Sequence, residues 1–208
     1  MTHDDLTRHM GETLVHVTAA SNVPLIMAHG LMPAATLAKL AGVTPERMAM
    51  RHVRRKIAPP FGMCVLNHQK PILDAGDAPD RMLDGYTGLA WAAQLDNRVF
   101  FAPLKAVEDF KKSLARDLPM AELKVSTRGL LEAMGDLTDL APINSGNFRQ
   151  GGAHARRGDW IYVPVSAGLP AFRQNRIKRG LKETPDTVKE ISIRGTIPAD
   201  VLRAIVVA

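Results

Sequence analysis

Short alternating segments rich in β-branched residues are the feature that most limits what this chain can fold into. Each segment is long enough for only one strand, and helical segments or turns separate it from the next. We expect strands at residues 14–18, 97–102, 122–127, 159–164 and 187–193. Neither an internal repeat nor a linker divides the sequence, so this order predicts a single α+β domain over residues 1–208.

The helices expected between these strands are short. Thr44-Pro-Glu-Arg47 places an N-cap residue before a proline at the first helical position, which predicts a helix from Thr44 to about Lys56. Gly30 stands where a glycine commonly follows a helix end, after a short helix at residues 23–27. Further helices are expected at residues 34–41, 79–94, 104–116, 128–134 and 200–204.

Composition excludes several classes of protein. Hydrophobic residues make up 46% and charged residues 23% of the chain, which is typical of a globular protein and not of a disordered one. The single cysteine, Cys64, rules out an internal disulfide framework and a cysteine-rich zinc site. No helical histidine pair encloses a carboxylate, so we expect no metal. The absence of a long apolar run and of a signal peptide at the N-terminus predicts a cytoplasmic protein.

Basic charge is concentrated in one segment. The whole chain carries a formal charge of +6, whereas residues 149–182 contain eight basic residues and one acidic residue, a net charge of +7. A solvated loop and helix face would explain this concentration, and so would a footprint for a phosphate-bearing ligand. On the second interpretation, the nucleic-acid contacts would come from Arg149, Arg156, Arg157, Arg173, Arg176 and Arg179.

Four short motifs resemble those of DarT-like ADP-ribosyltransferases and occur in the same order. The first, Leu14-Val-His16-Val-Thr18 with Asn22 and Gly30-Leu31, resembles the element at the edge of that family's NAD pocket. The others are Arg54 in its basic cluster, the aromatic segment Phe100-Phe101-Ala-Pro103, and Glu190, which stands eight residues before Pro198 like the family's catalytic glutamate.

The resemblance implies an ADP-ribosyltransferase fold, with split mixed β-sheets, peripheral helices and long loops. It implies NAD as a substrate, release of nicotinamide, and a nucleic acid base (DNA or RNA) as acceptor of ADP-ribose. A toxin or defence role, with an antitoxin as partner, is implied as well. Glu190 and Arg54 would be catalytic, and the NAD-binding residues would be His16, Thr18, Asn22, Gly30, Leu31, Arg51 and Phe100.

Each of these residues also has a purely structural interpretation. Glu190 could be an exposed strand residue, His16 a hydrogen-bonded core histidine, and Arg54 part of a solvated helix face. Only one of Phe100 and Phe101 can face a ligand if their strand alternates, and the resemblance favours Phe100.

The chain as a whole is also similar to a bacterial family of uncharacterised proteins of about 200 residues. The shared pieces are Leu95-Asp-Asn97-Arg98-Val-Phe-Phe101 and Ile143-Asn-Ser-Gly146, and Asn67-His68-Gln69 departs from that family's pattern. Two further hypotheses stay open. One is a related enzyme that modifies a protein, a small molecule or an RNA 2′-phosphate, and the other is a nucleic-acid-binding domain without enzymatic activity.

Overall fold

The structure is a computed structural model that describes residues 3–104, 107, 118–146, 148 and 156–207. Its strands are β1 (Thr13–Ala19), β2 (Arg55–Ile57), β3 (Cys64–Leu66), β4 (Arg98–Pro103), β5 (Met120–Ser126), β6 (Thr138–Ala141), β7 (Val163–Pro164) and β8 (Glu190–Arg194). Six of these strands form a sheet in the order β5-β1-β4-β8-β6-β7, and β2 pairs with β3 in a separate hairpin. All of these strand pairings are antiparallel.

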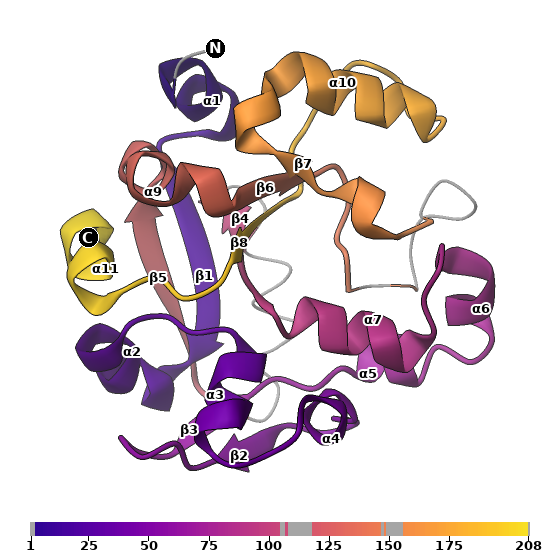
Figure 1. The fold of residues 1–208 in the computed structure, drawn as a ribbon. Coiled ribbons are helices and arrows are strands. Elements are labelled where there is room, and N and C mark those ends of the chain that lie inside the picture. Colours follow the sequence, from indigo (N-terminus) through magenta and orange to yellow (C-terminus); the bar gives the residue numbers. More distant parts are fainter. Residues whose placement is uncertain (1–2, 105–106, 108–117, 147, 149–155, 208) are drawn as a thin grey trace.

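Helices surround the sheet (Figure 1). The longer ones are α1 (His3–Met10), α7 (Gly88–Leu95), α9 (Thr127–Met134) and α10 (Gly168–Lys178). The shorter ones are α2 (Val23–His29), α3 (Ala34–Leu40), α4 (Pro45–Ala49), α5 (Lys70–Leu73), α6 (Ala78–Met82) and α11 (Ala199–Ile205). Single turns of 3-10 helix are η1 (Ala20–Asn22), η3 (Gly135–Leu137), η5 (Asp159–Ile161) and η6 (Val165–Ala167).

This mixture of helices with an antiparallel sheet confirms the predicted single α+β domain. The expectation of a mixed sheet is wrong for the described strands, because neighbouring strands run in opposite directions. Alternation of residues marks a strand but carries no information about its direction, so the sequence pattern could not have corrected this expectation.

The sheet has a narrow junction between β1 and β4, where only a short stretch of backbone is paired. β1 pairs with β5 over seven residue pairs, but with β4 over only two, Leu14 with Pro103 and Val15 with Ala102. On the other side of this junction, β4 pairs with β8 over four residue pairs. The β5-β1 pair and the other four strands are therefore joined by a short stretch of backbone pairing.

The two faces of the sheet pack against different helices. Leu14, Phe101 and Ile191 point into the main core, which α1, α9, α10 and α11 cover. On the opposite face Ala141 packs with Trp91 of α7 in a second core cluster. Because side chains alternate along a strand, a residue next to a main-core residue faces the opposite side of the sheet. This alternation decides which residues of β4 and β8 reach the space next to α7.

Several predicted elements have different bounds in the structure. The expected helix 44–56 ends at Ala49, the expected helix 79–94 is divided into α6 and α7, and the expected strand 159–164 is mostly the turn η5. β6 and α10 were not predicted from the sequence. The predicted helix 104–116 lies largely outside the described residues. Within the described part of the chain, no helix is long and apolar enough to cross a membrane.

Gly30 ends α2 at a position that excludes a side chain. Its φ is +93°, a conformation that favours glycine, and a Cβ built on it would lie 2.5 Å from the carbonyl oxygen of Ile197. The next residue, Leu31, is buried and exchanges two backbone hydrogen bonds with Ile197, each 2.9 Å long. The backbone of Leu31, which follows Gly30, thus joins the segment after α2 to the segment after β8 by hydrogen bonds.

We expect Gly30→Ala to lower the free energy of unfolding by about 2 kcal/mol or more, because it combines a strained backbone with a clash. Gly42→Ala is the matched control, since Gly42 has a φ of +67° but no atom within 4 Å of the added Cβ. Urea denaturation of both variants measures the difference. An equal loss of unfolding free energy in the two variants would show that the close contact of the added Cβ with Ile197 does not affect stability.

Candidate functional site

Three of the residues selected by resemblance lie on three neighbouring strands. His16 is on β1, Phe100 is on β4 and Glu190 is on β8, and these strands are adjacent in the order β1-β4-β8. Segments that are far apart in the sequence are therefore brought together at the narrow junction of the sheet and beside it. We refer to His16, Phe100 and Glu190 as the three-strand site.

His16 bridges the narrow junction. Its Nδ1–H donates a 2.9 Å hydrogen bond to the carbonyl oxygen of Phe100, just beyond the last backbone pair of β1 and β4. Its ring also packs against Phe101, with 5.8 Å between ring centroids. Burial lowers the pKa of His16, although the bond to Phe100 acts in the opposite direction. The ring is therefore held neutral, and with its proton on Nδ1 its Nε2 is a hydrogen-bond acceptor.

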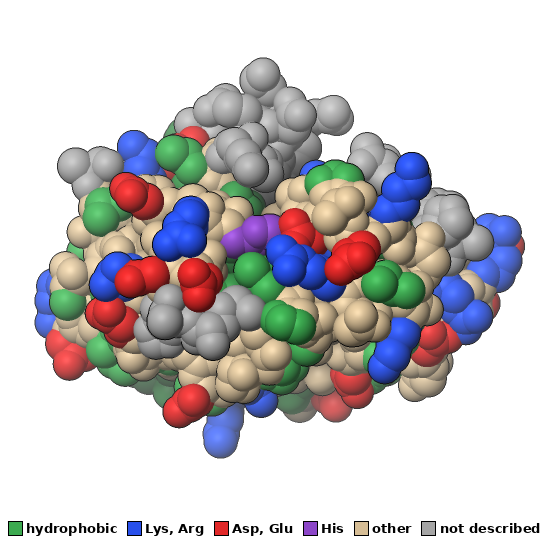
Figure 2. Space-filling model, turned by 90° about the horizontal axis from the view of Figure 1, so that it is seen from above, with side chains coloured by type: hydrophobic (Ala, Val, Ile, Leu, Met, Phe, Trp, Pro, Cys, Tyr) green, Lys and Arg blue, Asp and Glu red, His purple; other side chains and the backbone are tan. Residues whose placement is uncertain are grey.

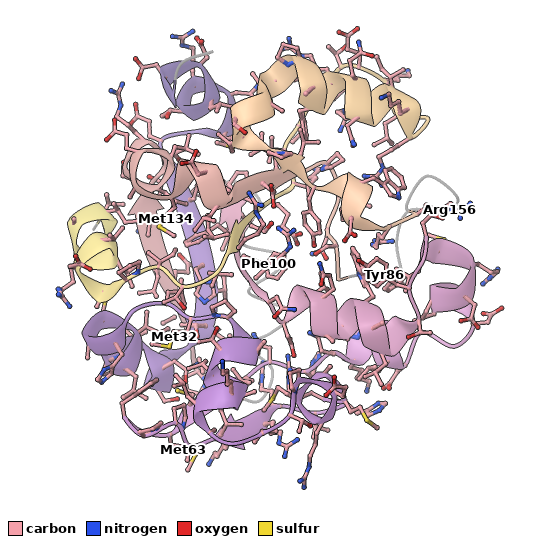
Figure 3. The ribbon with its side chains drawn as sticks, viewed as in Figure 1. Met32, Met63, Tyr86, Phe100, Met134 and Arg156 are labelled. Atoms are coloured by element: carbon pink, nitrogen blue, oxygen red, sulfur yellow. The ribbon has the colours of Figure 1, made fainter. Side chains whose placement is uncertain are left out.

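Phe100 and Phe101 point to opposite faces of the sheet. Phe101 is 2% exposed and belongs to the main core, whereas Phe100 is half-buried and packs against the cluster of Trp91 and Tyr162. Figure 3 shows Phe100 close to the end of α7 from which the chain continues into β4. Of the two rings, Phe100 is the one on the same face as Glu190. His16, which packs against Phe101, lies on the opposite face, and its contact with Phe100 is the hydrogen bond to the backbone carbonyl.

Glu190 is the first residue of β8 and faces away from the main core, toward the turn at residues 143–146. Its Oε2 accepts a 3.4 Å hydrogen bond from the backbone N–H of Ser145. Its Oε1 is buried and has no hydrogen-bond partner among the described residues. The carboxylate is therefore not the exposed strand group that its polar sequence neighbours suggested.

Burial raises the pKa of Glu190 to about 7, and this outweighs hydrogen bonding from Ser145 and the charges of Arg157 and Arg98, which lower it. A carboxyl group with a pKa near neutral can accept or donate a proton under physiological conditions. Burial also raises the pKa of the nearby Tyr162, so its phenol stays protonated.

Groups from α7 and β4 lie near Glu190 and the turn that it faces. Trp91 of α7 donates a 3.0 Å hydrogen bond from Nε1 to the carbonyl of Ser145. Arg98 of β4 pairs with Asp139 at 2.6 Å and lies 3.9 Å from the centre of the Tyr162 ring. The ionisable groups close enough to act on the Glu190 carboxyl therefore include Arg98, which is already paired, and Tyr162.

The elevated pKa of Glu190 makes a prediction about stability. The unfolded carboxyl group ionises near its model value of 4.5, but the folded one keeps its proton until about pH 7. The folded state therefore binds more protons over this range, and the free energy of unfolding falls as the pH rises, by at most about 1.4 kcal/mol per pH unit.

Urea unfolding of the parent and of Glu190→Gln between pH 5 and pH 7 measures this effect. We expect the stability of the parent to fall relative to the variant as pH rises. Other titrating groups, His16 among them, are present in both proteins and cancel in the difference. Parallel pH curves would show that Glu190 ionises at its ordinary pKa in the folded protein.

Arg51 does not have the position that the sequence suggested. It lies in the loop after α4, its side chain is 4% exposed, and its Nη1 and Nη2 bind the carboxylate of Asp96 at 2.5 and 2.8 Å. Its Nη1 and Nε also donate to the carbonyls of Met48 and Asn67. A guanidinium occupied in this way has a structural role, and this placement does not support the prediction that Arg51 binds NAD.

Arg54 lies in the same loop and is half-buried, so it is not on a solvated helix face. Its Nε donates to Oδ1 of Asn67 at 3.2 Å, and its Nη2 lies 4.0 Å from the sulfur of Met120. Met120 pairs with Ala19 at the end of β1. Arg54 is therefore near the end of the strand that carries His16.

Thr18 and Asn22 connect β1 to the hairpin. Asn22 binds both backbone polar groups of Val65, donating to its carbonyl at 2.8 Å and accepting from its N–H at 2.9 Å. The same Nδ2 group donates to the Thr18 hydroxyl at 3.1 Å. Both side chains are buried. As with Gly30 and Leu31, these residues hold backbone segments together.

The basic segment does not form the expected basic surface. Arg157, Arg176 and Arg179 are all less than 9% exposed. Arg156 pairs with Asp84, and Arg173 pairs with Asp186. Arg149 lies outside the described residues. On the face that contains α1 and α10, basic and acidic side chains are interspersed (Figure 2). The three buried arginines therefore do not contribute to an exposed basic surface, and their predicted contacts with a nucleic acid gain no support from the structure.

Sequence reasoning missed the residues that surround Glu190. Ser145 and Arg98 lie in Ile143-Asn-Ser-Gly146 and in Leu95–Phe101, the two pieces noted for their similarity to a bacterial family, but neither piece suggested a chemical role. Among the described residues, no group of three or more His, Cys, Asp or Glu side chains could hold a metal ion. Cys64 is buried, and burial raises its pKa.

Residues 12–204 match the model of a family of unknown function, DUF7002, and the chain therefore belongs to that family. No curated protein matches the chain, and no solved structure matches it. The family assignment carries no chemistry, so any activity has to be argued from the three-strand site.

Proposed function

We propose that this protein is an NAD-dependent ADP-ribosyltransferase with an ADP-ribosyltransferase-like fold, and that it transfers ADP-ribose to a nucleic acid base. The observation that supports this most directly is the placement of His16, Phe100 and Glu190 on adjacent strands. The three residues come from three separate sequence motifs, and Phe100 and Glu190 lie on the same face of the sheet.

In the proposed reaction, nicotinamide leaves with the electron pair of the bond that joins it to the ribose. The oxocarbenium-like transition state carries positive charge, which the Glu190 carboxylate stabilises. The acceptor forms a bond to the same ribose carbon, and its proton passes to Glu190. The pKa of about 7 suits this role, since a substantial fraction of Glu190 is ionised at neutral pH.

The other site residues would bind the substrate. Nε2 of His16 would accept a hydrogen bond from a ribose hydroxyl, because Nδ1 is engaged with Phe100. Since the His16 ring packs on the Phe101 side of the sheet, this ribose would have to lie at the junction of β1 and β4 and contact both faces. The ring of Phe100 offers an apolar wall to nicotinamide. Arg54, at the end of β1, would bind the pyrophosphate with its guanidinium. Since Oε1 of Glu190 is buried, substrate has to displace side chains that cover it.

The position of Trp160 supports a nucleic acid base as the acceptor of ADP-ribose. Its ring is 37% exposed, and the guanidinium of Arg179 lies 4.5 Å from its centre. An exposed indole supported by a cation is a suitable surface on which a base can stack. Arg156, which is exposed and lies close in sequence, could add a contact to a phosphate group.

The proposal is tested by incubating the protein with NAD labelled in the adenylate part and with one acceptor at a time. The acceptors are single-stranded DNA, duplex DNA, RNA, RNA with a terminal 2′-phosphate and an unrelated protein. We expect release of nicotinamide and transfer of label to a nucleic acid base. Transfer only to protein or to the 2′-phosphate would support the related enzyme instead. Absence of NAD binding by calorimetry, with salt-sensitive binding of nucleic acid, would overturn the proposal in favour of a non-enzymatic binding domain.

A further inference from the structure

Arg157 is one of the largest fully buried side chains among the described residues, with 1% of its surface exposed. Its backbone is fixed by two hydrogen bonds of 2.7 Å, from its N–H to the carbonyl of Met82 and from the N–H of Asp84 to its own carbonyl. Burial lowers its pKa to about 10, which still leaves the guanidinium charged at neutral pH. A buried charge of this kind is costly unless an opposite charge compensates it.

The guanidinium of Arg157 donates two hydrogen bonds to one carbonyl group, that of Asn144. Its Nε and Nη2 both donate to the oxygen of Asn144, at 3.2 and 3.0 Å, and it lies 4.6 Å from the centre of the Phe148 ring. The carbonyl of Asn144 and the N–H of Ser145 belong to the same peptide unit. Because that unit is planar, fixing the direction of its carbonyl also fixes the direction of its N–H.

That N–H is the group that points at Glu190, with 3.4 Å between Ser145 N and Oε2. On the other side of Ser145, its carbonyl accepts the hydrogen bond from Trp91. Arg157, the Asn144–Ser145 peptide and Glu190 therefore form a chain from a cation through a peptide dipole to a carboxylate, in which each hydrogen bond strengthens the next.

We propose that Arg157 is a positioning residue of the Glu190 site, which orients the Asn144–Ser145 peptide toward the carboxylate and supplies the compensating positive charge. It acts through the peptide and does not touch the substrate. The catalytic consequence rests on the proposed function, but the coupling between the two residues does not. The other ionisable groups near Glu190 are Arg98 and Tyr162, and Asp139 already pairs with Arg98.

The test is a titration of the Glu190 carboxyl carbon by NMR, assigned with Glu190→Gln, in the full chain without ligand. We expect Arg157→Gln to raise the titration midpoint by about one pH unit or more, because it removes a nearby cation. Arg157→Lys keeps the charge and is expected to restore a midpoint close to that of the parent.

Arg176→Gln is the matched control. Arg176 is also buried, at 8% exposed, but it donates to the carbonyl of Lys182 and its nearby charge is Asp186. We expect no change in the Glu190 midpoint in this variant. An unchanged midpoint in Arg157→Gln, or an equal shift in Arg176→Gln, would overturn the proposal.

A second measurement applies if Arg157→Gln folds poorly. Above its titration midpoint Glu190 is ionised, and loss of Arg157 then leaves a buried carboxylate without its cation. Adding Glu190→Gln is therefore expected to restore part of the lost thermal stability at a pH above the midpoint measured for Arg157→Gln. A double variant no more stable than Arg157→Gln would refute the coupling. Neither readout involves NAD, so coupling without nicotinamide release would contradict the proposed function alone.

Discussion

Glu190→Gln is expected to lower the rate of nicotinamide release from NAD about 100-fold or more. Glutamine carries no negative charge to stabilise the oxocarbenium-like transition state, and it cannot take up the proton that the nucleic acid base loses. The substitution keeps the size of the side chain and retains an oxygen for the N–H of Ser145. We therefore expect NAD affinity, measured by calorimetry, to stay close to that of the parent. Chromatographic measurement of nicotinamide gives the rate.

Glu132→Gln serves as the control for this experiment. Glu132 is an exposed residue on α9, outside the three-strand site, and the same chemical change there is expected to leave the rate unaltered. If Glu190→Gln releases nicotinamide as fast as the parent, Glu190 has no catalytic role. Lost NAD binding in Glu190→Gln, with the fold intact, would instead indicate a role in binding.

Asp96→Ala is expected to lower the free energy of unfolding by about 3–5 kcal/mol, the largest stability loss that we predict. Asp96 and Arg51 are each about nine-tenths buried or more, and the variant would leave the guanidinium of Arg51 without a counter-ion. Gln69, which donates to Oδ1 of Asp96 at 2.8 Å, would lose an acceptor too. Urea denaturation at neutral pH measures the loss.

The exposed pair of Asp77 and Arg81 provides the comparison. These side chains are 76% and 70% exposed and lie 3.2 Å apart, so Asp77→Ala is expected to cost less than about 1 kcal/mol. A loss in Asp96→Ala as small as that in Asp77→Ala would mean that Arg51 finds water or another partner. The structural assignment of Arg51 would then have to be abandoned.

Strands with clear alternation were predicted well, whereas elements that depend on distant partners were not. β1 and β4 carry apolar residues at alternate positions, and the predicted segments 14–18 and 97–102 fall within one residue of their bounds. The predicted helix 44–56 stops at Ala49 because the chain turns there to bring Arg51 to Asp96. That pairing joins residues from different segments, and no local pattern indicates it.

The charge of the basic segment illustrates the same limit. A count of residues shows that residues 149–182 carry a net charge of +7, but it does not show which of the arginines are solvated. In the structure Arg157 is buried beside the turn that faces Glu190, while Arg156, its neighbour in the chain, is exposed and pairs with Asp84. Two adjacent residues of the same type thus have different roles.

By itself the sequence determined the α+β class, the strands that carry His16, Phe100 and Glu190, and the choice of these three residues as candidates. Those conclusions depend on local alternation and on short motifs, which are properties of consecutive residues. Only the tertiary structure decided the strand order that brings the three together, the burial that raises the pKa of Glu190, and the place of Arg157 behind the Asn144–Ser145 peptide. Burial and pairing are set by residues far away along the chain, and their energies therefore have no local signature.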